Sequence, residues 1–168
     1  MSLYEATVPV LTKYLSNLHK WIDKATAHAE AKKFDVEVLT TARLAPDQYP
    51  FLRQVQAACD QAKFTVAKLV GREPPAHPDN EKTLAELRQR ITTVIDYITT
   101  FKPEDFAGAD ERACSHTWMG GKQMRGGDYL DHFALSNFYF HLVTAYAILR
   151  HNGVPLTKID YIGSLPLS

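Results

Sequence analysis

Asn137 and His141 are the residues whose types and spacing point most directly to chemistry. They lie four positions apart in a strongly apolar stretch that is predicted to be helical. Residues four apart on a helix share one face, with Cβ atoms about 5–6 Å apart. Both side chains can therefore reach into the same space. Two histidines at this spacing would suggest a metal-binding pair, but here the first residue is an amide.

Other polar motifs give weaker signals. His132 lies nine residues before His141, about half a turn out of phase, and is expected at the surface. The remaining histidines, including His116, show no ligand spacing. The segment Gly120–Gly127 is rich in glycine but lacks the GxxxxGK[ST] pattern, so we interpret it as a flexible loop. No nucleophile and base with supporting context emerges.

Composition excludes several classes of function. The chain has 168 residues, 45% of them hydrophobic, and 19 basic residues balance 19 acidic ones. This balance provides no net field for binding nucleic acid or an anionic membrane. No run of about 18 uncharged apolar residues is present, as a membrane span would need, and no signal peptide begins the chain. The two cysteines, Cys59 and Cys114, lack CxxC spacing, and Cys59 is expected to be a buried core thiol. We expect a cytoplasmic protein.

Four helices are predicted from the spacing of apolar residues. They cover about residues 3–31 (or from residue 8), 47–70, 83–101 and 128–151. Asp47 is the expected N-cap of the second helix and Gly71 its C-terminal stop, while Thr83 and Glu86 form a capping box for the third.

The connections between these helices are also informative. A proline-rich loop follows the second helix, and a loop or short hairpin is expected between the third and fourth. We expect an irregularity near residues 136–137 and a C-terminal tail that docks on the bundle. The predicted fold class is all-α, a four-helix bundle forming a single domain over residues 1–168.

The fourth helix is apolar on every face. Phe138 and Leu142 mark one face, Tyr139 and Tyr146 a second, and Phe140 a third. A helix of this kind must be buried all round. A small bundle satisfies that requirement most easily if part of the helix meets a second copy, so we predict a homodimer.

Several motifs together resemble a known superfamily. They are Arg43-Leu-Ala-Pro-Asp47, Gln54-Val-Gln56 with Asp60, the segment 137–141, and Ala145–Gly153. Their combination is similar to a bacterial domain-of-unknown-function branch of the DinB/YfiT-like superfamily. The resemblance implies an up-down-down-up four-helix bundle that is usually dimeric.

The superfamily also implies a metal site. Many members hold a divalent metal on three histidines, one from the second helix and two from the fourth, and some act as hydrolases or as transferases of low-molecular-weight thiols. Carried over to this chain, the fourth-helix positions fall on Asn137 and His141. The second-helix position falls on Gln54 or Gln56, and Asp60 lies one turn beyond Gln56. His141 is thus the one retained ligand position.

These residues define the candidate pocket and two functional hypotheses. Amides are poor ligands for zinc or nickel, so we expect no metal and no cofactor. The first hypothesis is a degenerate metal pocket around His141 that binds a small molecule, with His141 hydrogen-bonded to Asn137 or to a glutamine across the bundle. The alternative is a metal-dependent thiol transferase or hydrolase that uses a divalent cation.

Overall fold

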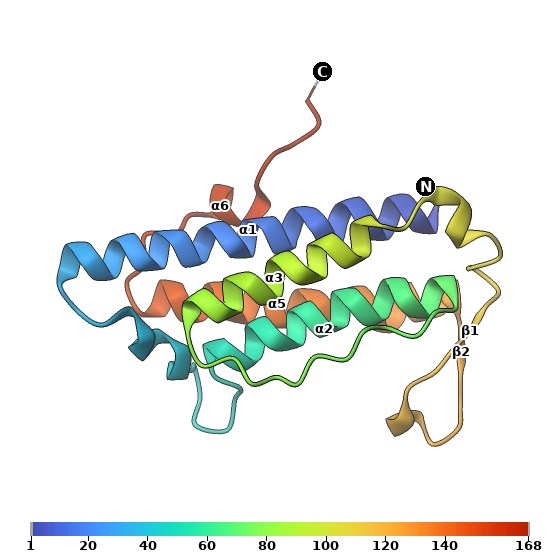
Figure 1. Ribbon diagram of the computed structural model, residues 1–168, viewed down its shortest axis with the longest axis horizontal. Coiled ribbons are helices and arrows are strands. Elements are labelled where there is room, and N and C mark those ends of the chain that lie inside the picture. The colour runs from blue at the N-terminus through green and yellow to red at the C-terminus, as the bar shows by residue number, and fades with distance from the viewer. Residues whose placement is uncertain (1, 168) are drawn as a thin grey trace.

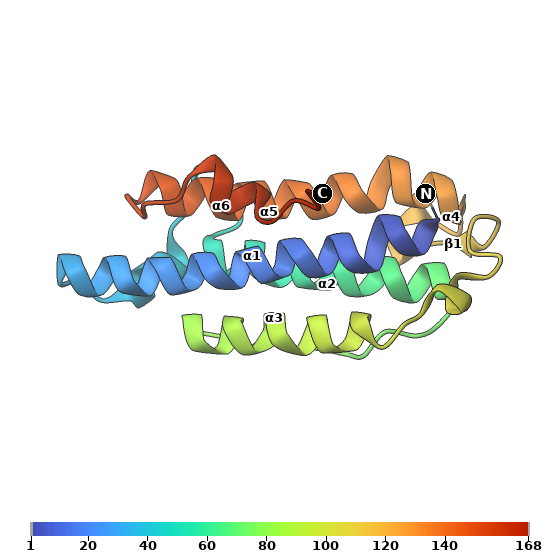
Figure 2. The ribbon, with the colours of Figure 1, turned by 90° about the horizontal axis from the view of Figure 1, so that it is seen from above.

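The computed structural model describes residues 2–167 and contains four long helices lying side by side (Figure 1). Their bounds are α1 Leu3–Lys32, α2 Phe51–Val70, α3 Leu84–Thr99 and α5 Leu135–His151. Helices α1 and α5, the first and last of the four along the chain, run in the opposite direction to α2 and α3. This is the up-down-down-up order. Helix α2 packs against both α3 and α5, and α1 packs against α3 (Figure 2). The predicted all-α bundle is confirmed.

Most predicted helix ends are found where the capping residues place them. Thr83 and Glu86 form the expected capping box at the start of α3, and Gly71 ends α2 with a left-handed φ of 72°. The prediction that Asp47 caps α2 is wrong. Pro50 occupies the N-cap position without a side-chain bond, and the Phe51 N–H donates instead to the Ala42 carbonyl at 2.8 Å.

A minimal hairpin connects the third and fourth helices, as predicted. Strands β1 Ala113–Cys114 and β2 Met124–Arg125 pair antiparallel, and the 3-10 turn η3 Thr117–Met119 lies in the loop between them. The chain then enters helix α4 Gly126–Tyr129. A Cβ atom at Gly126 would lie 1.9 Å from the Ala109 carbonyl oxygen, so only glycine fits at this junction.

A π-helical turn interrupts the fourth long helix. It spans Leu130–Ala134, labelled η4, and joins α4 to α5 without a break in direction. The irregularity predicted near residues 136–137 therefore lies about one turn earlier. A π turn contains one extra residue and changes which side chains face inward. Tyr129 and Phe133 lie four residues apart at this turn, with ring centroids 5.8 Å apart.

One hydrophobic core runs through the bundle. Leu11, Leu15, Val55, Ile91 and Leu142 all belong to it, as predicted. Cys59 is also fully buried, and burial raises the pKa of its thiol to about 12. Further short 3-10 turns, η1 Val36–Thr41 and η2 Pro103–Phe106, cover the ends of the core. None of the helices within residues 2–167 is both long and apolar enough to cross a membrane.

The C-terminal tail docks on α1, as predicted. It forms the short helix α6 Lys158–Ile162, and the Trp21 indole N–H donates to the Asp160 carbonyl at 2.9 Å. Tyr146 of α5 packs edge-on against Trp21 and Tyr161, so the tail buries part of α5. Phe140 and Val143 on the same helix stay 53% and 47% exposed.

A long connection between α2 and α3, the crossing loop (residues 71–83), runs back along the bundle beside α2 (Figure 1). A buried arginine, Arg90, holds this loop against the bundle through ion pairs. The Arg90 side chain is only 2% exposed and donates to Asp79 at 3.0 Å and Glu81 at 2.9 Å, both in the crossing loop. It also donates to Asp60 of α2 at 2.7 Å.

Two further cations complete this ion cluster. Lys63 is buried and lies 2.9 Å from Asp60 and 3.0 Å from the His77 Nδ1 atom. Arg53 pairs with Asp79 at 3.0 Å. The cluster thus contains three cations (Arg53, Lys63, Arg90) and three carboxylates (Asp60, Asp79, Glu81), so its formal charges cancel.

Replacing Arg90 by Met should destabilise the protein strongly. Removing one partner of a buried ion pair leaves uncompensated buried charge, which costs about 3–5 kcal/mol. Arg88→Met is the matched control, because Arg88 lies on the same helix, is 43% exposed and pairs with the exposed Asp23. Its expected cost is about 0–1 kcal/mol. Urea unfolding measures both, and equal effects of the two variants would contradict a structural role for the ion cluster.

Candidate functional site

Gln54 of α2 contacts α5 with a defined amide orientation. Its Nε2 atom donates to the Tyr49 carbonyl oxygen at 3.1 Å. A carbonyl oxygen only accepts hydrogen bonds, so the amide nitrogen must face Tyr49 and the Oε1 atom must face the other way. That oxygen lies 2.8 Å from Nδ1 of His141.

This contact fixes the tautomer of His141. Because Gln54 Oε1 can only accept, Nδ1 must carry the proton, and the neutral ring then has its lone pair on Nε2. Burial lowers the pKa of His141, which favours the neutral form. Within residues 2–167, Nε2 forms no hydrogen bond. The ring therefore presents an unused acceptor.

Gln61, two turns further along α2, orients Asn137 in the same way. The Thr65 hydroxyl donates its single proton to the Gln61 backbone carbonyl at 2.7 Å, so its oxygen accepts from Gln61 Nε2 at 3.1 Å. The Gln61 Oε1 atom then faces α5 and accepts from Asn137 Nδ2 at 2.7 Å. Asn137 Oδ1 remains without a hydrogen bond from residues 2–167.

Asn137 and His141 line a common cavity of about 300 Å³. Its walls are largely aromatic, and two carboxylates of the ion cluster reach its edge. The lining residues are Tyr49, Arg53, Ala57, Asp60, Gln61, Phe64, Asp79, His116, Trp118, Phe133, Asn137 and His141. The Tyr49 and His141 rings are nearly parallel, at 13°.

His116, from the loop after β1, closes this cavity. Its Nε2 atom lies 3.2 Å from the hydroxyl of Tyr129, and that hydroxyl lies 3.5 Å from Gln61 Nε2. Trp118 stacks on His116 at 15° and also packs against Phe133. Burial lowers the pKa of His116 and raises that of Tyr129 to about 12, so both groups are neutral near pH 7.

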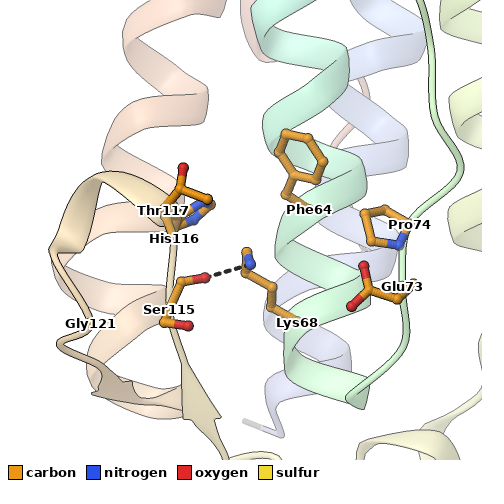
Figure 3. A pocket seen from close by; sticks show the side chains of 8 residues that line it. All are labelled: Phe64, Lys68, Glu73, Pro74, Ser115, His116, Thr117 and Gly121. Atoms are coloured by element: carbon orange, nitrogen blue, oxygen red, sulfur yellow. Dashed lines mark hydrogen bonds between the residues drawn. The ribbon is translucent and has the colours of Figure 1, made fainter.

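A second cavity of about 590 Å³ adjoins the first (Figure 3). Phe64 and His116 line both cavities. Lys68 of α2 lies between the hairpin loop and the crossing loop, and its Nζ atom donates to the Ser115 carbonyl at 2.5 Å (Figure 3). The two cavities are therefore neighbours.

Most of the predicted site residues lie at the cavity, but Gln56 does not. Gln54 lies behind His141, whereas Gln56 points away from the cavity and donates to Glu81 at 2.8 Å. The two glutamines are two residues apart and thus differ by about 200° around the helix. Asp60 reaches the cavity wall but is also bonded to Arg90.

Among the residues that build the site, Gln61, Tyr129 and His116 were not predicted from the sequence. Gln61 could have been found, because it lies two turns after Gln54 and so shares its face. Tyr129 lies just before the π turn, whereas the sequence predicts the irregularity of this helix near residues 136–137. His116 reaches the cavity only through the path of the hairpin loop.

The donor set does not fit the three-histidine metal site that the superfamily implies. Gln54 Oε1 is occupied by His141, and Gln61 Oε1 is occupied by Asn137. At the ligand positions carried over from the superfamily, this leaves one imidazole nitrogen and one amide oxygen for a metal. Over residues 2–167, no three His, Cys, Asp or Glu side chains are grouped so that they could hold an ion.

Replacing His141 by Ala should cost about 1–3 kcal/mol, because the Gln54 oxygen is left buried without a donor. His132→Ala is the control, since His132 lies on the π turn of the same long helix but is exposed. We expect its effect to stay within about 0.5 kcal/mol. Chemical denaturation measures both, and a neutral His141→Ala would contradict the assigned hydrogen bond.

Comparison with known proteins identifies the relatives of this chain. The family described as "Domain of unknown function (DUF1993)" matches residues 3–162. A crystal structure of a DinB family member protein from Shewanella denitrificans is similar to this chain, with 48% sequence identity and a TM-score of 0.95. The match covers 99% of this chain and 94% of that one. No curated protein matches the chain. The chain belongs to the DUF1993 family, a branch with the DinB-like fold.

Proposed function

We propose that this protein binds a small molecule in the cavity between α2, α5 and the hairpin loop. The observation that carries the proposal is the unused pair of acceptors, His141 Nε2 and Asn137 Oδ1, beside a cavity of about 300 Å³. Both residues are half-buried and line the cavity, so a ligand in the cavity can reach their acceptors. A ligand that supplies the missing donors would complete the hydrogen bonding.

The surrounding contacts support a site that is already ordered before the ligand arrives. Gln54 and Gln61 hold His141 and Asn137 in place from α2, a helix whose inner residues are fully buried. Side chains that are fixed in advance lose little entropy on binding. Aromatic side chains line much of the cavity, as in typical small-molecule sites.

A fragment screen tests this proposal. Small polar aromatic compounds, added to ¹⁵N-labelled protein, should shift the amide signals of Asn137 and His141 and the indole signal of Trp118. Trp118 lines the cavity and is 63% exposed, whereas Trp21 is buried against α6 and serves as an internal control.

Two variants locate the binding site. Asn137→Leu should weaken binding of the hits, because it removes one acceptor, and His132→Ala should leave it unchanged. If no compound shifts these signals, or if the hits shift only signals away from the cavity, the proposed function is wrong.

We also infer that the protein forms a homodimer through α5. Phe140 and Val143 are exposed apolar residues on one strip of this helix. An apolar hollow of about 240 Å³, lined by Val143, Tyr146, Lys158 and Tyr161, lies beside them. The Phe140 ring thus projects next to a hollow on the same face. This arrangement suits a two-fold interface, because each copy supplies one ring and one hollow.

Light scattering at micromolar concentration should report a dimer. The double variant Phe140→Glu, Val143→Glu should be monomeric, because it places four like charges in the interface. Val38→Glu is the control, since Val38 is similarly exposed but lies on η1, away from α5. A monomeric wild type, or a dimer that survives the double substitution, would exclude this interface.

A further inference from the structure

The two acceptors of the cavity cannot readily become donors. Turning the Gln54 amide over would place its oxygen against the Tyr49 carbonyl oxygen. Turning the Gln61 amide over would place its oxygen against the Thr65 hydroxyl oxygen, whose proton is already donated. Each change brings two acceptors together and leaves a buried group unpaired. His141 Nε2 and Asn137 Oδ1 are therefore fixed as neighbouring acceptors.

Their spacing suits a ligand with two neighbouring donors. Asn137 and His141 lie four residues apart, on adjacent turns of one helix face, so their Cβ atoms are about 5–6 Å apart. An amidine or guanidine group carries N–H donors on two nitrogens in one plane and so can address two acceptors at once. A carboxylate has no donor and would meet two lone pairs.

The electrostatics of the cavity tolerate a cation. Arg53 lines the cavity, but Asp79 neutralises it at 3.0 Å. Asp60 also lines the cavity, and Arg90 and Lys63 contact its Oδ1 atom, whereas within residues 2–167 its Oδ2 atom accepts no hydrogen bond. No unpaired cation of the ion cluster faces the cavity, and one carboxylate oxygen remains available.

The walls of the cavity favour a flat group. Tyr49, Phe64, Trp118 and Phe133 all line it. Arg53 already lies over the Tyr49 ring and Lys63 over the Phe64 ring. The Trp118 and Phe133 rings are therefore the ones left to attract a planar delocalised cation, which can also stack on them. Both neutral imidazoles, His116 and His141, extend this aromatic lining.

From these observations we infer that the cavity selects planar molecules that bear an amidine or guanidine group, with its N–H donors directed at Asn137 and His141. This inference rests on the proposed function and names the chemical class of its ligand. The adjoining cavity of about 590 Å³ gives room for a substituent on that group.

Three probes of nearly equal size and shape test the inference: benzamidine, benzamide and benzoate. They differ in offering two donor nitrogens, one donor nitrogen, or none. NMR titration of the full chain should show benzamidine binding at Asn137 and His141 about tenfold or more tighter than benzoate, with benzamide between them. A tenfold ratio corresponds to one charge-assisted hydrogen bond.

A pair of asparagine variants tests the assignment of the acceptors. Asn137→Leu should lower benzamidine affinity about fivefold or more, since a hydrogen bond to a charged donor is lost. Asn152→Leu, just past the far end of α5, should not change it, because the Asn152 side chain donates to the Ile148 carbonyl and does not line the cavity. Thermal melts confirm that each variant is folded before binding is compared.

The outcomes separate the two proposals. If benzoate or benzamide binds at His141 as tightly as benzamidine, or if benzamidine does not bind there, the inference about ligand class is overturned. The wider fragment screen then decides whether the cavity binds small molecules at all. Retained benzamidine affinity in folded Asn137→Leu would also overturn the inference.

Discussion

The whole structure depends on one constraint: α2 is buried along most of its length, yet it carries polar side chains on two opposite sides. Gln54 and Gln61 face α5, while Gln56, Asp60 and Lys63 face the crossing loop. Each buried polar group left without a partner costs about 1–3 kcal/mol. Neighbouring segments must therefore supply partners on both sides, and this requirement explains why a loop follows the whole length of α2.

The two sides of α2 meet this requirement differently. On the loop side, the charges of three cations and three carboxylates balance, and their ion pairs hold α2, α3 and the crossing loop together. On the α5 side, both glutamines are satisfied, but their partners Asn137 and His141 each keep an unused acceptor. The ion-paired side has a structural role, and the α5 side is where we propose that a ligand binds.

The bundle could be predicted from the sequence, whereas the site could be predicted only in part. Apolar spacing and local caps such as Thr83 and Gly71 are properties of nearby residues, and these predictions were correct. The start of α2 was placed too early because Phe51 is held by a distant carbonyl rather than by a local cap. His116 reaches the cavity through the path of a loop, and no helical period encodes that path.

The floor of the cavity is formed by helices, but much of its wall comes from loops. Tyr49 precedes α2, Asp79 belongs to the crossing loop, and His116 and Trp118 belong to the hairpin segment. Insertions and substitutions in loops disturb a packed core far less than changes in helices do. Related proteins can thus diverge in the compounds they accept while keeping the same bundle. Under the proposed function, comparison of natural relatives should begin with these three segments, where we expect changes in ligand choice.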